Sequence, residues 1–175
     1  EHLKQAYAAD IKIRTEGMEG LSRADLTVNV HEITAAGPIY KDANVTVHAI
    51  LVRHGLWAQA FGYAIHAGAR TIVISGDTVP SDAIVNACHG CDVLVHEVYS
   101  ADRFDLVFGP AHGQYHRNSH TSTRELAELA SRAKPKLLLL YHQLYFGPQD
   151  GVDLEKEIRR TYPGVVVSGR DLTEY

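Results

Sequence analysis

Hydrophobic and polar positions follow two different rhythms along this chain. Residues 2–14 carry the spacing of a helix, and the Gly-containing segment 16–22 ends it. Short segments rich in β-branched and aromatic residues then follow, separated by Gly, Asp and Asn, at residues 28–33, 37–40, 45–52 and 61–67. Such spacing is typical of antiparallel strands.

From residue 71 onward, strand-like and helix-like segments alternate. Apolar, β-branched runs predict strands at residues 71–75, 92–98, 136–142 and 164–169. Amphipathic runs between them predict helices at residues 81–88, 122–133 and 153–162. Ser81 is placed to cap the first helix, and Thr121 or Ser122 to cap the second. No repeat or linker divides the chain, so residues 1–175 are expected to form a single α/β domain.

Composition supports a globular domain and narrows its partners. The 175 residues are 45% apolar and 22% charged, which is enough for a real hydrophobic core. The net charge of -4 gives no global basic field, so nucleic acid would bind only through a local basic patch. No apolar run approaches the ~20 residues that a membrane-spanning helix needs, so no membrane partner is expected.

Three predicted strands end on a side chain that can bind a metal ion. These side chains are His54, Asp77 behind Gly76, and His142. A single His at a strand end is more often structural, and an Asp after Gly is usually a turn residue. Three such ends together favour a site, because strands of one sheet deliver their last residues to its edge. Imidazole and carboxylate ligands suit zinc or a similar transition ion.

Five motifs in this chain resemble a known family in their order. VRHGLWAQAFGYAI, ISGDT, DVLVHEVY, SHTSTRELAELA and KLLLLYH follow one another as in the C-terminal half of metallo-β-lactamase-fold hydrolases of the ribonuclease Z type. The resemblance covers residues 45–167. It implies an α/β four-layer αββα sandwich, of which this chain would form the C-terminal half, with a mixed sheet and flanking helices.

The resemblance also implies a binuclear metal-dependent hydrolase. In such enzymes the residues that match His54 and His142 each hold one metal ion, and the residue that matches Asp77 bridges the two. A shared carboxylate is expected, because two dications ~3.5–4 Å apart repel strongly. The implied cofactor is a pair of zinc ions, with manganese or iron as alternatives, and metal-bound hydroxide would attack an ester-type substrate.

Three further residues take their roles from the same resemblance. His120 matches a His that contacts the scissile group, so it would stabilise developing negative charge or pass a proton to the leaving oxygen. A surface His in a polar loop is the alternative interpretation. His96 and Glu97 match a His-Glu pair that would orient the metal ligands through hydrogen bonds. A purely structural pair fits the sequence equally well.

The chain departs from the family at its start. The signature HxHxDH, which supplies most of the other ligands, is absent and would lie before Glu1. The N-terminal half of the same fold is therefore expected in the same or another chain. If the chain stands alone, the alternative is a non-catalytic binding or assembly subunit. A cytoplasmic location is expected, and a homo-oligomer is compatible with the sequence.

The short connection between two predicted strands narrows the range of possible substrates. Transfer-RNA-processing members of one type carry a long flexible arm between the strands that contain Tyr63 and Asp77, and no arm fits into the residues present here. The late strand also reads LLYHQLYF instead of the usual THFS-like sequence. A small-molecule ester is therefore favoured over RNA. Phosphodiester, carboxylic ester and lactone all stay open.

Cys88 and Cys91 have CxxC spacing. A structural zinc site would need a second such pair, which the chain lacks. A redox pair is one interpretation, but packing at a helix end is preferred.

Three histidines recur at spacing four in HGQYHRNSH, at His112, His116 and His120. This spacing would line one face of a helix and could chelate a metal ion. The Gly, Asn and Ser between them favour a loop instead, in which the histidines are mobile or lie behind the metal ligands.

Overall fold

The computed structural model describes residues 2–22, 29–109 and 112–175, and the chain divides into two compact units, Glu1–Glu32 and Ile33–Tyr175. The first unit holds α1 (His2–Ala6) and α2 (Ala8–Glu16), which confirm the predicted opening helix, with a turn at residue 7. Neither helix has a buried residue. The expectation of one domain over residues 1–175 stays a prediction.

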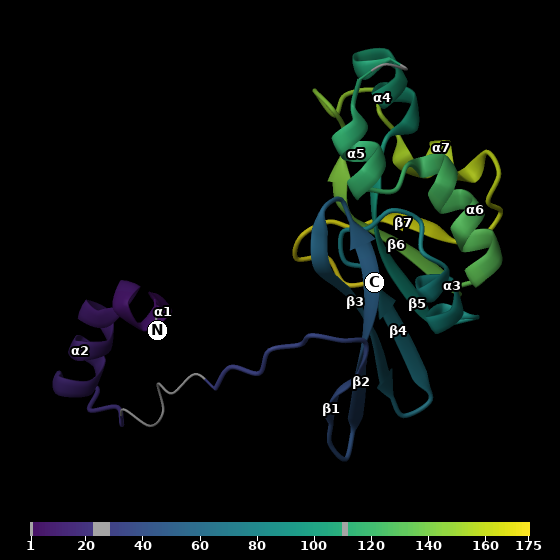
Figure 1. Cartoon of the computed structure of the whole chain (residues 1–175). Helices are drawn as coiled ribbons and strands as arrows, with labels where there is room; N and C mark the ends of the chain where they lie inside the picture. Colours follow the sequence, from purple (N-terminus) through teal and green to yellow (C-terminus); the bar gives the residue numbers. More distant parts are fainter. Residues whose placement is uncertain (1, 23–28, 110–111) are drawn as a thin grey trace. The chain divides into compact units, whose positions relative to one another are not determined.

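The second unit is built on a seven-stranded mixed sheet whose strands lie side by side in chain order (Figure 1). The strands are β1 (Gly37–Lys41), β2 (Val45–His54), β3 (Trp57–Ala67), β4 (Arg70–Ile74), β5 (Val93–Tyr99), β6 (Leu137–Leu144) and β7 (Val166–Ser168). Neighbours from β1 to β4 pair antiparallel, and neighbours from β4 to β7 pair parallel. The mixed sheet and its flanking helices confirm the α/β fold class expected from the sequence.

One predicted strand does not form. Residues 29–33 of the segment 28–33 have no strand pairing, and Val28 lies outside the described residues. Val30 is exposed, so the alternating pattern buries no apolar face here. A strand needs a hydrogen-bonded neighbour, and β1 at the edge of the sheet begins only at Gly37. The strand prediction for residues 29–33 is therefore wrong.

Three predicted helices cover one face of the sheet. They are α3 (Asp82–Cys88), α6 (Thr123–Ala133) and α7 (Leu154–Arg159), and between them they contact β2, β3, β4, β5 and β7. A capping box starts α6, in which the Ser122 side chain accepts from the Glu125 N–H and the Glu125 side chain accepts from the Ser122 N–H. The core beneath these helices includes the fully buried side chains of Val73, Ile84, Leu94, Leu126, Leu138, Leu140 and Ile158.

The opposite face of the sheet also carries apolar side chains, but these are only partly covered. They alternate with the core residues along each strand, as the two-residue period of a β-strand requires. Leu51 is half exposed, and the intermediate positions include Phe61, Tyr63, Ile65, Ile72, Ile74, Val95, Leu139 and Tyr141. A sheet face of this character is normally covered by another layer. In a four-layer sandwich, the second sheet takes that place.

Two helices were not predicted. α4 (Ala101–Phe108) begins at Ser100, whose side chain accepts a hydrogen bond from the backbone N–H of Arg103. α5 (Gln114–Ser119) lies where the sequence favoured a loop, so that interpretation is wrong for these residues. Gly113 has a φ of 77° and stands just before the helix, so it marks the start of α5 and does not interrupt it. Among the described helices, none has the length and apolar character needed to cross a membrane.

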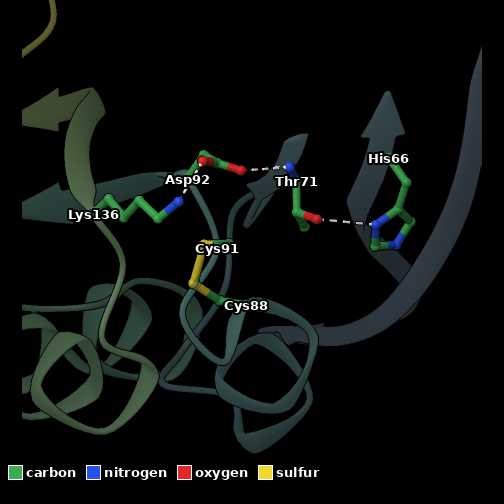
Figure 2. The surroundings of a disulfide bond; sticks show 6 residues. All are labelled: His66, Thr71, Cys88, Cys91, Asp92 and Lys136. Atoms are coloured by element: carbon green, nitrogen blue, oxygen red, sulfur yellow. Dashed lines mark hydrogen bonds and ion pairs between the residues drawn. A yellow bond between two sulfur atoms is a disulfide. The ribbon is translucent and has the colours of Figure 1, made fainter. Parts of the chain in front are cut away.

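A disulfide joins Cys88, the last residue of α3, to Cys91, which lies just before β5 (Figure 2). Both cysteines are buried. The preferred interpretation, packing at a helix end, matches these positions, and the two sulfur atoms are in addition bonded to each other. A redox role for the pair stays a prediction. Beside the disulfide, Asp92 accepts hydrogen bonds from Lys136 Nζ at 2.9 Å and from the Thr71 N–H at 2.8 Å. These donors hold the pKa of Asp92 well below its usual range.

Gly76 allows the chain after β4 to turn tightly and present Asp77. Its φ is 64°, and a Cβ at this position would lie 2.4 Å from the carbonyl oxygen of Phe61. Gly68, in the turn between β3 and β4, has a similar φ of 58° but open space around it. Gly68 is therefore a matched control for the close contact at Gly76.

We expect Gly76→Ala to lower the free energy of unfolding by about 3 kcal/mol, because the new methyl group adds a backbone clash to the conformational strain. Gly68→Ala adds strain alone and should cost about 1 kcal/mol. Urea unfolding of both variants measures the difference. Equal losses would contradict the close approach of the Asp77 turn to β3.

Candidate metal centre

Three elements of the sheet bring the predicted ligands to one place. His54 is the last residue of β2, and Asp77 follows the turn after β4, as the sequence predicts. His142 lies inside β6 and not at its end, because the strand continues to Leu144. Its φ is 42°, and the pairing of β5 with β6 shifts register at this point. The irregularity in β6, and not the end of the strand, therefore brings His142 to the site.

The side chains of His54, Asp77, His120 and His142 converge. One ligand atom each from His54, Asp77 and His120 lie within 4.8 Å of one another. His142 Nε2 lies 3.2 Å from Asp77 Oδ2, and the ring centroids of His120 and His142 are 5.5 Å apart. The structure thus unites the three proposed metal ligands with the proposed catalytic His120.

A backbone contact fixes the orientation of His54. Its Nδ1 lies 2.7 Å from the carbonyl oxygen of Ser119. A carbonyl oxygen only accepts hydrogen bonds, so Nδ1 must carry the proton. The other nitrogen, Nε2, then holds a free lone pair in the neutral ring, which is the form that binds metal ions. The donor set of imidazole nitrogens and carboxylate oxygens therefore fits a divalent transition ion.

Glu97 is the buried carboxylate behind this group. One of its oxygens, Oε1, accepts hydrogen bonds from the Thr121 N–H at 2.9 Å and the Thr78 N–H at 3.3 Å. The other, Oε2, lies 3.4 Å from His120 Nδ1. Burial raises the pKa of Glu97, and His120 with the two N–H donors opposes part of that rise. Glu97 thus links the segments that carry Asp77 and His120.

His96 lies on the other side of β5 from Glu97. It alternates with Glu97 along the strand and shares its face with the core residues Leu94 and Val98. Its Nδ1 lies 2.7 Å from the Glu97 carbonyl oxygen, and complete burial lowers its pKa to about 4. The structure does not bring His96 into the converging group, and its role in orienting ligands stays a prediction.

His116, which the sequence predicts to lie in a loop, is a neighbour of the site. It lies on α5, and its ring centroid is 5.9 Å from that of His120. Its Nδ1 is buried without a hydrogen-bond partner among the described residues. Burial first and the neighbouring His120 second lower the pKa of His116. The spacing of four residues between His116 and His120 is the sequence feature that could have placed His116 near the site. His112, four residues before His116, is exposed.

Comparison with known proteins gives this arrangement a family. The family model described as a β-lactamase superfamily domain matches residues 6–143. The chain is 31% identical over 159 residues to ribonuclease Z of Mycobacterium bovis (strain BCG / Pasteur 1173P2), a match that covers 85% of this chain and 54% of that protein. The chain spans about half the length of the curated relatives it matches.

Solved structures share the fold. The metallo-β-lactamase fold protein YhfI from Bacillus subtilis superposes with a TM-score of 0.58 at 21% identity, covering 76% of this chain and 49% of that one. The short form of human tRNase Z gives a TM-score of 0.54 at 20% identity, covering 79% and 45%. The fold is therefore that of the metallo-β-lactamases. The chain belongs to the β-lactamase superfamily and is ribonuclease Z-like within it.

Replacing Glu97 tests whether its carboxylate holds the site together. Glu97→Ala would leave the buried N–H groups of Thr78 and Thr121 without an acceptor, so we expect the free energy of unfolding to fall by about 2–4 kcal/mol. Glu97→Gln keeps a carbonyl oxygen for these donors and should cost clearly less. Urea unfolding of the two variants checks this. Equal losses would show that the shared acceptor is not what stabilises the two segments.

Proposed function

We propose that this chain carries part of the active centre of a metal-dependent phosphodiesterase. The observation that supports this most directly is the convergence of His54, Asp77, His120 and His142 at one edge of the sheet. Several of the matching relatives are ribonucleases Z, which favours a phosphodiester over a carboxylic ester or lactone.

In this proposal His54, Asp77 and His142 hold a pair of divalent ions, with Asp77 as the shared ligand. Zinc suits the two imidazoles and the carboxylate, and manganese or iron are alternatives. When bound, such ions supply Lewis acidity and make water more acidic. The 3.2 Å between His142 Nε2 and Asp77 Oδ2 is compatible with two ligands that face a common ion.

His120 is the residue that we assign to the scissile group. It is nearly buried, and its Nδ1 faces Glu97 Oε2 at 3.4 Å, which leaves Nε2 for the substrate. A His held against a carboxylate can donate a proton to the leaving oxygen or stabilise charge on a phosphoryl oxygen. α6 begins three residues later, at Thr123, and the amides of its N-terminus add positive potential near the same place.

The rest of the ligand set would come from the N-terminal half of the same fold, in the same or another polypeptide. The partly covered sheet face opposite the helices supports this, because it offers an apolar surface for a second sheet. The turn between β3 and β4 contains only residues 68 and 69, so it holds no substrate-binding arm. The phosphodiester substrate and the divalent metal ions are part of this proposal.

Hydrolysis of bis(p-nitrophenyl) phosphate by the protein as isolated, supplied with zinc or manganese, tests the proposal. We expect His120→Ala to slow turnover by about 10²–10³-fold, because an oxyanion or proton donor is lost. His66→Ala, which changes a His outside the converging group, should leave turnover unchanged.

Two outcomes would contradict the phosphodiesterase. Faster hydrolysis of p-nitrophenyl acetate than of the phosphodiester, with the same dependence on His120, would indicate a carboxylic ester hydrolase. Failure of a preparation that also contains the N-terminal half of the fold to hydrolyse either compound would indicate the non-catalytic binding subunit.

A further inference from the structure

Tyr141 stands next to one candidate metal ligand and reaches the segment that carries another. It is the residue of β6 directly before His142, and it pairs with Glu97 on β5. Its side chain lies on the sheet face opposite the helices, because it alternates with the core residue Leu140. Glu97 lies on the same face. Tyr141 is half-buried, and the proposed chemistry gives it no role.

The hydroxyl group of Tyr141 bonds to the turn that presents Asp77. The strand order is β4, β5, β6, so the ring of Tyr141 crosses β5 to reach the residues that follow β4. There its hydroxyl forms hydrogen bonds with the side chain of Ser75 and the backbone of Gly76. Burial raises the pKa of Tyr141, and the nearby carboxylates of Asp77 and Glu97 raise it further. Tyr141 therefore connects β6 to the turn before Asp77.

Ser75 is the point at which three segments of the chain meet. Its side chain is completely buried. Its Oγ donates a hydrogen bond to the Gly76 carbonyl oxygen at 2.7 Å and accepts one from the Glu97 N–H at 3.2 Å. A serine hydroxyl has one donor and two acceptor positions, so the Tyr141 O–H fills the remaining acceptor position. With Tyr141 in place, all three positions of the Ser75 hydroxyl are used.

The backbone at both ligands departs from regular strand geometry. Gly76, directly before Asp77, has a φ of 64°. His142 has a φ of 42°, and the pairing of β5 with β6 shifts register just after Glu97. Tyr141, which pairs with Glu97, is the last regular position of β6 before this shift. A side-chain bond from Tyr141 to the Asp77 turn therefore links the two irregular segments to each other.

Two ligands that face one ion need a fixed separation. His142 Nε2 lies 3.2 Å from Asp77 Oδ2, but the two side chains are 40% and 38% exposed, so packing around them holds them only in part. Their separation then depends on the backbone segments beneath them. Residues that hold ligands through hydrogen bonds commonly change metal affinity by about 10–100-fold when they are replaced.

We propose that Tyr141 is a positioning residue of the metal centre. Its hydroxyl links the turn at residues 75–76 to β6 and so holds Asp77 at a fixed distance from His142. Tyr141 contacts neither ion nor substrate and acts through these two ligands. The inference rests on the proposed metal-dependent function and adds a residue to it. The alternative is a hydroxyl that stabilises the folded chain and has no effect on the metal.

The zinc affinity of Tyr141→Phe tests this assignment. It is measured by competition with a chromophoric chelator, in a preparation that contains both halves of the fold. We expect the affinity to fall by about tenfold, because the variant lacks only the hydroxyl that holds the Asp77 turn.

Tyr162→Phe is the matched control for a lost hydroxyl. Tyr162 is also buried, but it packs in the core on the helix side of the sheet. Its replacement should leave the zinc affinity unchanged, even where urea unfolding with a chelator shows that both variants lose stability. Unchanged zinc affinity in Tyr141→Phe, or an equal loss in Tyr162→Phe, would overturn the inference.

The visible spectrum of the cobalt(II)-substituted protein reports on ligand geometry separately from affinity, because its bands depend on the arrangement of the ligands. We expect the bands to shift in Tyr141→Phe and to match those of the wild type in Tyr162→Phe. A purely structural hydroxyl would leave the spectrum of the metal-loaded Tyr141→Phe protein unchanged, and that result would reject the positioning role.

A second change at Ser75 tests the path of the effect. In a Ser75→Ala background, Tyr141→Phe should lower the zinc affinity by clearly less than tenfold, because the acceptor of the Tyr141 O–H is already removed. A full tenfold loss in this background would contradict the path through Ser75.

Zinc affinity and hydrolysis of bis(p-nitrophenyl) phosphate fail independently. A tenfold loss of zinc affinity in Tyr141→Phe, in a preparation that does not hydrolyse the phosphodiester, would support Tyr141 and reject the phosphodiesterase. Hydrolysis by the wild type, with unchanged zinc affinity in Tyr141→Phe, would keep the phosphodiesterase and reject the positioning role. A wild-type preparation that binds neither zinc nor manganese would reject both.

Discussion

The buried carboxylate of Glu97 is the interaction on which the candidate site depends. It holds the backbone N–H groups of Thr78 and Thr121, which come from segments far apart in the sequence, and it faces His120. A buried carboxylate without such donors would be strongly unfavourable. These hydrogen bonds stabilise the folded chain and at the same time hold Asp77 and His120 close to each other. His54 reaches the same place from β2, and His142 reaches it from β6.

Much of the sheet and part of the site could be predicted from the sequence. The apolar runs that end at His54 and Asp77 set the direction of their strands. Because β2 and β4 are both antiparallel to β3 between them, they run in the same direction and end on the same side of the sheet. His142 was placed at a strand end, but it lies within β6 at a left-handed residue that a hydrophobic pattern does not reveal. Its position depends on the pairing with β5, which is a tertiary contact.

The errors share one physical origin. Residues 29–33 alternate like a strand but have no strand pairing, and α5 forms although its Asn and Ser, and the Gly before it, favour a loop. At residues 29–33 the lack of a pairing partner outweighs local propensity, and at α5 the contacts with β2 do so. The groove between α5 and the β2–β3 hairpin, lined by Trp57 and Tyr115 among others, could not be predicted, because its walls come together only in the folded chain. The metal-binding chemistry of the ligands could be predicted from the sequence, but the surface around them could not.

Anomalous diffraction from crystals grown with zinc locates a bound ion without any assumption about activity. We expect an anomalous peak between His54, Asp77 and His142, and its loss in Asp77→Asn, where the shared negative charge is removed. A wild-type map without a peak at this edge of the sheet, or an equally strong peak in Asp77→Asn, would contradict this expectation.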